Sequence, residues 1–69
     1  MTKHKLGIAI RNRRKFLKIT QKELSEIVGI GLRSLVDTEQ GKGNPTIDQL
    51  HKITEALGLT IEVKVKSNE

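Results

Sequence analysis

The sequence contains no cysteine and only two histidines among its 69 residues. Without thiols the chain can form no disulfide and offers no thiolate ligand to a metal. His4 and His51 lie far apart and have no flanking ligand pattern, so we expect no metal site and no cofactor. The length predicts one domain with a small core. The lack of cysteine is compatible with a reducing compartment, and we expect the protein in the cytoplasm.

Aromatic residues are nearly absent, since Phe16 is the only one. Proteins that bind RNA or single-stranded DNA stack bases on aromatic rings, and helices that lie on membranes use them as anchors. No apolar run approaches the ~20 residues that span a bilayer, and the start at 1–5 does not resemble a secretory signal. Duplex DNA is bound through phosphates and groove edges and needs no aromatic side chain.

The first 22 positions contain no acidic residue, and Glu23 is the first one in the chain. The same stretch has eight basic side chains, which are Lys3, Lys5, Arg11, Arg13, Arg14, Lys15, Lys18 and Lys22. A region of one charge sign suits a polyanion such as nucleic acid. The alternatives are an ordinary solvated helix face and a basic helix on a membrane surface.

Helical spacing of apolar residues predicts four helices and therefore a mainly α fold. They run from about 5 to 17, 21 to 28, 32 to 40, and from the cap Thr46 to Gly58. Thr20 followed by Glu23 is typical of a capping box at the start of the second helix. We expect that helix to bury Leu24, Ile27 and Val28. We expect the fourth to bury a stripe of Ile47, Leu50, Ile53, Ala56 and Leu57.

At the end of the chain the spacing of apolar residues changes from helical to alternating. Residues 60–66 alternate strictly, which places Ile61, Val63 and Val65 on one face of a β-strand. No other segment reads as a strand, so the simplest partner is the same strand of a second copy. The alternative is a frayed or extended tail. We therefore divide the chain into residues 1–58 and a dimerisation strand and tail at 59–69.

The middle of the chain carries a spaced pattern rather than one short motif. It runs from Gln21-Lys22-Glu23-Leu24-Ser25 through Val28-Gly29-Ile30 to Leu35 and Glu39-Gln40-Gly41. This pattern resembles the Cro/phage-repressor (XRE-type) helix-turn-helix family over about residues 6–58. The resemblance implies a four-helix, lambda-repressor-like DNA-binding domain. Such a domain would act as a sequence-specific repressor that binds a palindromic duplex operator as a homodimer.

The tail carries a second resemblance. Residues 57–63, Leu-Gly-Leu-Thr-Ile-Glu-Val, look like the HipB-type antitoxin branch of that family. The resemblance implies a C-terminal strand that pairs across a dimer, a cognate toxin protein and repression of the toxin–antitoxin operon. An alternative is a protein-interaction module that neutralises a toxin and has little DNA role of its own.

Two charged residues fall on otherwise apolar faces. Arg14 shares a stripe with Leu6, Ile10 and Leu17, and Glu39 shares a face with Leu35. Buried ions are costly unless they are paired. The family often places an internal ion pair at these two positions, so we expect Arg14 and Glu39 to pair; the alternative is two surface side chains with buried stems.

The resemblance also assigns the DNA-binding residues. The base-reading positions of the third helix fall on Leu32, Arg33, Val36 and Asp37, and Ser34 is expected near the DNA backbone. The expected phosphate contacts are Gln21, Lys22, Gln40, Lys42 and Asn44.

Each base-reading position has an alternative role. Arg33 reads guanine or contacts phosphate, and Asp37 accepts from cytosine or orients Arg33. Leu32 and Val36 contact thymine methyl groups or extend the core.

Two positions depart from the family pattern. Lys18 stands where glycine or asparagine often ends the first helix, and Thr38 stands at a usually aliphatic core position. We expect both to lower stability. An enzyme is disfavoured, since the serines lack a histidine at useful spacing and no paired carboxylates or phosphate-binding loop appear.

Overall fold

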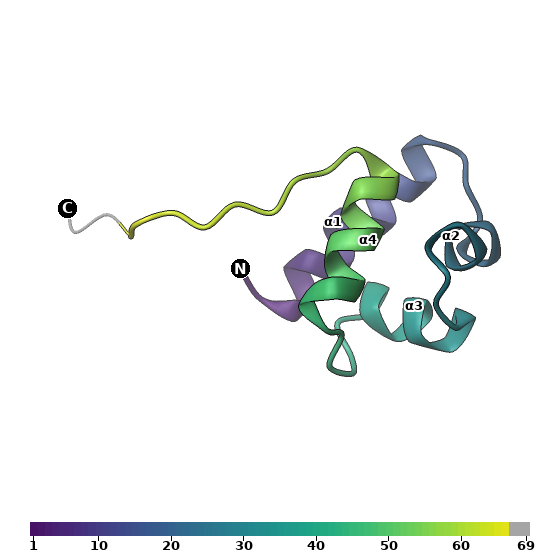
Figure 1. Cartoon of the computed structure of the whole chain (residues 1–69), viewed down its shortest axis with the longest axis horizontal. Helices are drawn as coiled ribbons and strands as arrows, with labels where there is room; N and C mark the ends of the chain where they lie inside the picture. Colours follow the sequence, from purple (N-terminus) through teal and green to yellow (C-terminus); the bar gives the residue numbers. More distant parts are fainter. Residues whose placement is uncertain (67–69) are drawn as a thin grey trace.

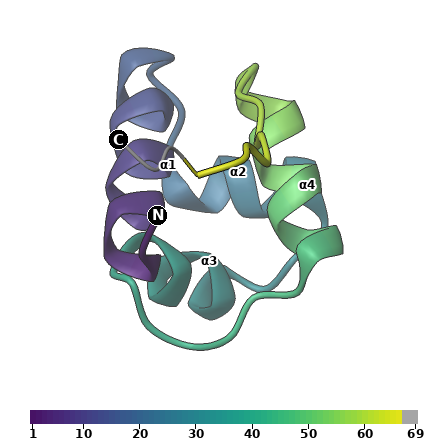
Figure 2. The same cartoon turned by 90° about the vertical axis from the view of Figure 1, so that its left-hand side faces the viewer.

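The computed structural model describes residues 1–66 and contains four helices in that range, α1 (Lys3–Phe16), α2 (Gln21–Val28), α3 (Leu32–Glu39) and α4 (Ile47–Leu57). α1 packs on α3 and α4, and α2 packs on the same two helices. Figure 2 shows α1 and α4 on opposite sides, with α2 and α3 between them. This confirms the predicted mainly α, four-helix arrangement.

The helix ends follow from side-chain and glycine caps. The capping box predicted at Thr20 and Glu23 is formed, and an equivalent box joins Thr46 to Gln49. Gly29 and Gly58 end α2 and α4 in the left-handed conformation, which glycine adopts at little cost. α1 begins two residues before the predicted Lys5, because the hydroxyl of Thr2 accepts a hydrogen bond from the backbone N–H of Lys5 and caps the helix earlier.

The core lies where the four helices meet. Its fully buried members are Ile10, Leu24, Leu35, Ile53 and Leu57. Each helix contributes at least one of them, so no helix can leave without exposing apolar surface to water. Leu6, Ile19, Val28, Ile30, Leu50 and Leu59 pack partly buried against this cluster.

The predicted buried stripe of α2 is wrong at one position, Ile27, and that of α4 is wrong at two, Ile47 and Ala56, since Ala56 is exposed as well. Ile27 and Ile47 are 63% and 78% exposed. In α2 the buried residues are Leu24 and Ser25, whose mean direction lies roughly 110° from Ile27 at about 100° per residue. Ser25 can be buried because its hydroxyl donates to the carbonyl oxygen of Lys22 at 2.7 Å. In α4 the buried residues are Ile53, Thr54 and Leu57, so the packed face turns toward Thr54 and away from Ala56, and Ile47 is the first residue of the helix.

Lys18 adopts φ 59°, in the left-handed region, and is the only such non-glycine residue among the described positions. A side chain there costs about 1–2 kcal/mol. We expect Lys18→Gly to raise the free energy of unfolding by about 0.5–1 kcal/mol, the remainder being offset by the freer unfolded chain. Thermal unfolding should show a midpoint several degrees higher, by roughly 2–8 °C. Lys18→Asn should fall between, and a lower midpoint for the glycine variant would contradict the assignment.

The strand predicted at 60–66 is not formed within the described residues. Residues 60–66 leave the helices as an extended segment in which no backbone hydrogen bond is formed (Figure 1). A strand needs a neighbouring strand to pair with, and a single chain supplies none. Positions 67–69 of the predicted tail lie outside the described residues. No described helix is both long and apolar enough to cross a membrane.

Candidate nucleic-acid interface

α2, a tight turn and α3 form the predicted helix-turn-helix. The turn is closed by two hydrogen bonds onto the carbonyl oxygen of Ser25, from the N–H groups of Gly29 at 2.9 Å and Ile30 at 3.0 Å. Gly29 has φ 80°, and half-buried Ile30 packs against the core. α3 then begins after Gly31, which has no capping side chain. The turn therefore fixes the direction of α3 and leaves its first N–H groups free of a side-chain partner.

The outer face of α3 presents the predicted base-reading residues. Arg33 is the most exposed of them, with 87% of its side chain accessible, and its Nε lies 3.5 Å from Oδ1 of Asp37 one turn later. Leu32 is 44% exposed, so it does not extend the core, whereas Val36 is half-buried. The geometry therefore places Asp37 where it can orient Arg33, and leaves Leu32 as an apolar contact on the surface.

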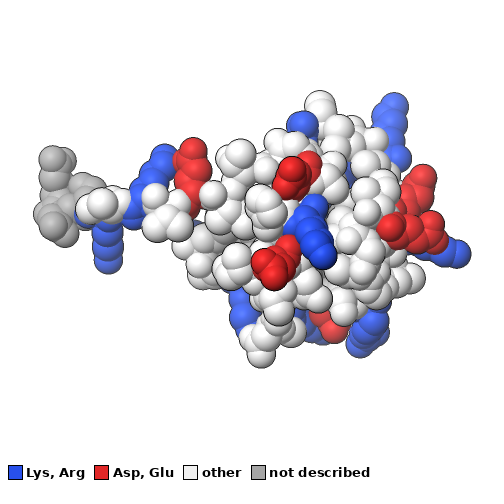
Figure 3. Space-filling model, in the orientation of Figure 1, with Lys and Arg blue, Asp and Glu red and all other residues white. Residues whose placement is uncertain are grey.

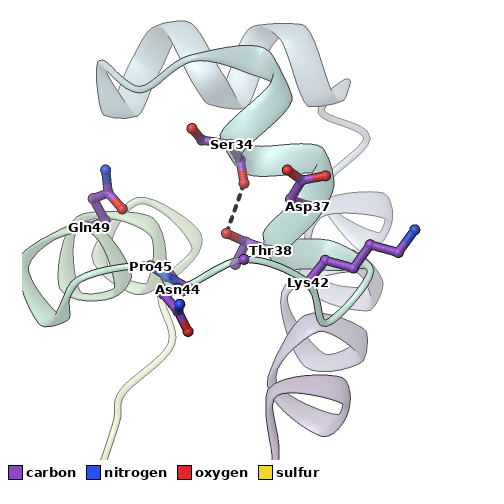
Figure 4. Close-up of a pocket in the computed structure, with 8 residues that line it drawn as sticks. Ser34, Asp37, Thr38, Lys42, Asn44, Pro45 and Gln49 are labelled. Atoms are coloured by element: carbon purple, nitrogen blue, oxygen red, sulfur yellow. Dashed lines mark hydrogen bonds between the residues drawn. The ribbon is translucent and has the colours of Figure 1, made fainter.

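The loop after α3 lines a small hollow with that helix. The hollow has a volume of about 100 Å³, and its walls include Ser34, Asp37, Lys42 and Asn44. Figure 4 shows Lys42 extending outward from this loop, and the hydroxyl of Thr38 directed at the carbonyl oxygen of Ser34. That hydrogen bond, 2.8 Å long, satisfies the buried hydroxyl of Thr38, which stands where the family pattern usually has an aliphatic residue.

Lys3 ties this loop to the first turn of α1. Its Nζ donates to the carbonyl oxygen of Gly43 at 2.7 Å and to Oδ1 of Asn44 at 2.5 Å. With its oxygen engaged, the amide of Asn44 keeps its NH₂ group for an acceptor such as phosphate. This role of Lys3 was not predictable from the sequence, because the contact spans 41 positions and no local pattern indicates it.

Arg14 of α1 and Glu39, the last residue of α3, form a buried ion pair. Arg14 Nε donates to Oε2 at 2.7 Å and its second nitrogen donates to Oε1 at 2.9 Å, with 9% and 2% of the two side chains exposed. The third nitrogen of Arg14 donates to the carbonyl oxygen of Ile19 at 2.9 Å. The pair thus joins the end of α1 to the end of α3, and no buried side-chain polar atom among the described residues lacks a partner.

Gln21, an expected phosphate ligand, is part of this buried group as well. Its Nε2 donates to Glu39 Oε1 at 3.1 Å. One amide hydrogen and the outward N–H groups at the start of α2 remain for a ligand. Lys22 and Gln40 are exposed on either side. Nearby, hydrogen bonds from the backbone and the hydroxyl of Thr20 lower the pKa of Glu23, so this helix start keeps an ionised carboxylate.

The apolar residues of the tail are uncovered in the single chain. Ile61 is 52% exposed, and Val63 and Val65 are each 99% exposed. Where the tail leaves the helices, Leu59 and Ile61 border a hollow of about 200 Å³ against α1. Unlike the other expected site residues, the three tail residues thus lie away from the helix-turn-helix (Figure 1).

Known proteins with similar sequences are helix-turn-helix regulators. The profile of the helix-turn-helix family matches residues 10–64. A helix-turn-helix-type transcriptional regulator of Methanothermobacter thermautotrophicus is 41% identical over 49 residues, which cover 71% of each chain. The regulator y4mF of Sinorhizobium fredii is 34% identical over 84% of this chain and 76% of its own.

Two larger proteins match over part of their length. The cryptic phage CTXphi transcriptional repressor RstR of Vibrio cholerae is 36% identical over 84% of this chain, which spans 52% of RstR. The crystal structure of the clp gene regulator ClgR of Corynebacterium glutamicum superposes with a TM-score of 0.81 at 27% identity, covering 87% of this chain and 64% of that one. The chain therefore belongs to the Cro/C1-type helix-turn-helix family of DNA-binding transcriptional regulators, which is not a family of enzymes.

Proposed function

We propose that this protein is a sequence-specific repressor that places α3 in the major groove of duplex DNA. The observation that supports this most directly is the outer face of α3, where an exposed Arg33 lies beside Asp37. An arginine fork oriented by a carboxylate suits the O6 and N7 atoms of guanine, and exposed Leu32 suits a thymine methyl group. This face is flanked by the expected phosphate ligands, which are Gln21, Lys22, Gln40, Lys42 and Asn44.

A salt titration of duplex binding tests the DNA role. With the duplex upstream of the gene as probe, the logarithm of the affinity should fall linearly and steeply with the logarithm of salt concentration. Absence of binding at low salt would overturn the proposal and favour the alternative, a protein-interaction module.

Arg33→Ala should separate base reading from phosphate contact. If Arg33 reads guanine, the variant loses about 1–3 kcal/mol of discrimination between the operator and a scrambled duplex, while the salt slope stays the same. Lys42→Ala is the control, because loss of a phosphate ligand should weaken binding to both duplexes alike and reduce the slope by about one for each bound copy of the chain. If Arg33→Ala loses the same affinity for both duplexes, Arg33 contacts the DNA backbone instead of a base.

We further propose that two copies pair through residues 60–66. The support is the strict alternation of this segment and the full exposure of Val63 and Val65, which a second copy would cover. A two-fold dimer would engage half-sites about one helical turn apart, roughly 34–36 Å.

Deletion of residues 60–69 should leave a monomer whose operator binding is weaker by about 10²-fold or more, because two linked reading heads bind jointly. Sedimentation velocity and a binding titration measure the two effects. The double variant Val63→Ser and Val65→Ser provides a milder test, since the backbone stays intact. A truncated chain that still sediments as a dimer would rule out the tail as the interface.

The resemblance of the tail to HipB-type antitoxins supports one narrower proposal, that the protein represses a toxin–antitoxin operon from the cytoplasm and binds the toxin. Co-purification with the product of the adjacent reading frame tests this. A neighbour with no effect on growth when expressed alone would exclude the antitoxin role without affecting the DNA role.

A further inference from the structure

We infer that α1 carries a second DNA-backbone surface, outside the helix-turn-helix, formed by His4, Arg11 and Lys15 and here named the α1 basic stripe. Together with Ile8 these residues are spaced by four, three and four, which puts them on one side of the helix. All four line a hollow of about 420 Å³, and Arg11 and Lys15 are exposed. The inference rests on the proposed DNA-binding function and extends it.

The position of the hollow links the stripe to DNA. Its other walls include Gln21, at the start of α2, and Gln40, just after α3. These are the two expected phosphate ligands at the two ends of the helix-turn-helix. A DNA strand that passes both of them runs along the mouth of the same hollow. The stripe is therefore continuous with the proposed reading surface, which favours duplex DNA over an acidic protein as its occupant.

The charges of the stripe are not neutralised within the molecule. α1 contains no acidic residue, and among the described residues neither Arg11 nor Lys15 has a carboxylate within ion-pair distance. Arg14, which also borders the hollow, is by contrast saturated by Glu39 and the carbonyl oxygen of Ile19. The net positive charge at the hollow thus comes from the exposed stripe.

The opposite side of the bundle has a different charge pattern. On α4, Lys52 lies four residues after Asp48 and three before Glu55, and His51 approaches Glu55 at 2.9 Å. In Figure 3, which shows the face crossed by α4, acidic and basic atoms are intermingled. A solvated face with no ligand is expected to look like α4, with its charges balanced, rather than like α1.

The test compares two charge-matched double variants of the full chain, Arg11→Gln with Lys15→Gln in the stripe, and Lys5→Gln with Lys52→Gln outside it. The probe is a mixed-sequence duplex of about 30 base pairs, since phosphate contacts need no operator. Each lost phosphate contact lowers the salt slope by about 0.9, so the stripe variant should lose about 1.8 for each bound copy of the chain, which weakens binding at 0.15 M salt by about 30-fold per copy. The control variant should keep a slope close to that of the wild type.

The outcomes are distinguishable. All four positions are exposed, so circular dichroism should show unchanged folding in both variants. If the wild type fails to bind any duplex at low salt, the proposed function itself is wrong. If the wild type binds and the stripe variant shows the same slope as the control, the α1 basic stripe does not contact DNA. That result would leave the helix-turn-helix role intact and point to an acidic protein as the occupant.

Discussion

Gly7→Ala is expected to lower the free energy of unfolding by about 3 kcal/mol, the upper end of the range for overpacking a core. A Cβ atom at this position would lie 2.5 Å from the carbonyl oxygen of Glu39 and 2.6 Å from that of Thr38. Both are backbone atoms of the end of α3, which cannot rotate away as a side chain can. Gly7 is therefore a point of close approach between α1 and α3, and any side chain there must push the two helices apart.

The sign of this effect is diagnostic, because helix propensity acts in the opposite direction. In a helix interior alanine is favoured over glycine by about 0.5–1 kcal/mol, so without the contact Gly7→Ala would stabilise α1. Ala9→Gly, at an exposed position of the same helix, measures that propensity alone. Thermal unfolding should show a midpoint lower by roughly 12–24 °C for Gly7→Ala, at about 4–8 °C per kcal/mol. A raised midpoint would mean that α1 and α3 do not touch at Gly7.

Much of the fold was predictable because local chemistry specifies it. The Thr20–Glu23 box and Gly29 mark α2 at both ends, and the observed bounds agree with the prediction. Gly7 was not recognised, because its role depends on a helix that follows some 30 residues later. Ile27 was misassigned for a related reason, since burial of the small, hydrogen-bonded Ser25 turns the packed face of α2 away from it.

The candidate site was predictable in its composition rather than in its contacts. The exposed position of Arg33 follows from helical spacing, and Asp37 four residues later follows from the same geometry. Lys3 and the α1 basic stripe could not be located in this way. The first reaches a loop 41 residues away, and the second becomes a surface only when the ends of α2 and α3 close the hollow beside it. The strand predicted for the tail is not formed in the single chain, because the strand that would pair with it belongs to a second chain.

The buried pair of Arg14 and Glu39 connects stability to the proposed site. We expect Arg14→Met or Glu39→Leu alone to cost about 3–5 kcal/mol, because each leaves an uncompensated charge in the interior. The double variant replaces both ions by apolar side chains of similar length and should lie within about 1 kcal/mol of the wild type. Denaturant unfolding of the four proteins would then give a coupling energy of several kcal/mol. Single variants that cost less than about 1 kcal/mol would show that the pair is solvated.

The surface pair of Arg33 and Asp37 is the matched control, since the arginine is 87% exposed at its side chain. The same cycle at these positions should give a coupling energy of at most about 0.5 kcal/mol, as for exposed pairs one turn apart on a helix. A comparable value for both cycles would contradict the burial of Arg14 and Glu39.

The double variant at positions 14 and 39 also separates folding from DNA binding. Glu39 accepts the hydrogen bond that holds Gln21 at the start of α2, so its removal frees the side chain of an expected phosphate ligand. We expect a folded protein whose duplex affinity is lower by about 10-fold, the equivalent of one hydrogen bond of about 1.4 kcal/mol. Adding Gln21→Ala should then cause no further loss, whereas in the wild type it should cause the full 10-fold. Wild-type affinity in the folded double variant would show that the pair only stabilises the fold and does not position Gln21 for DNA.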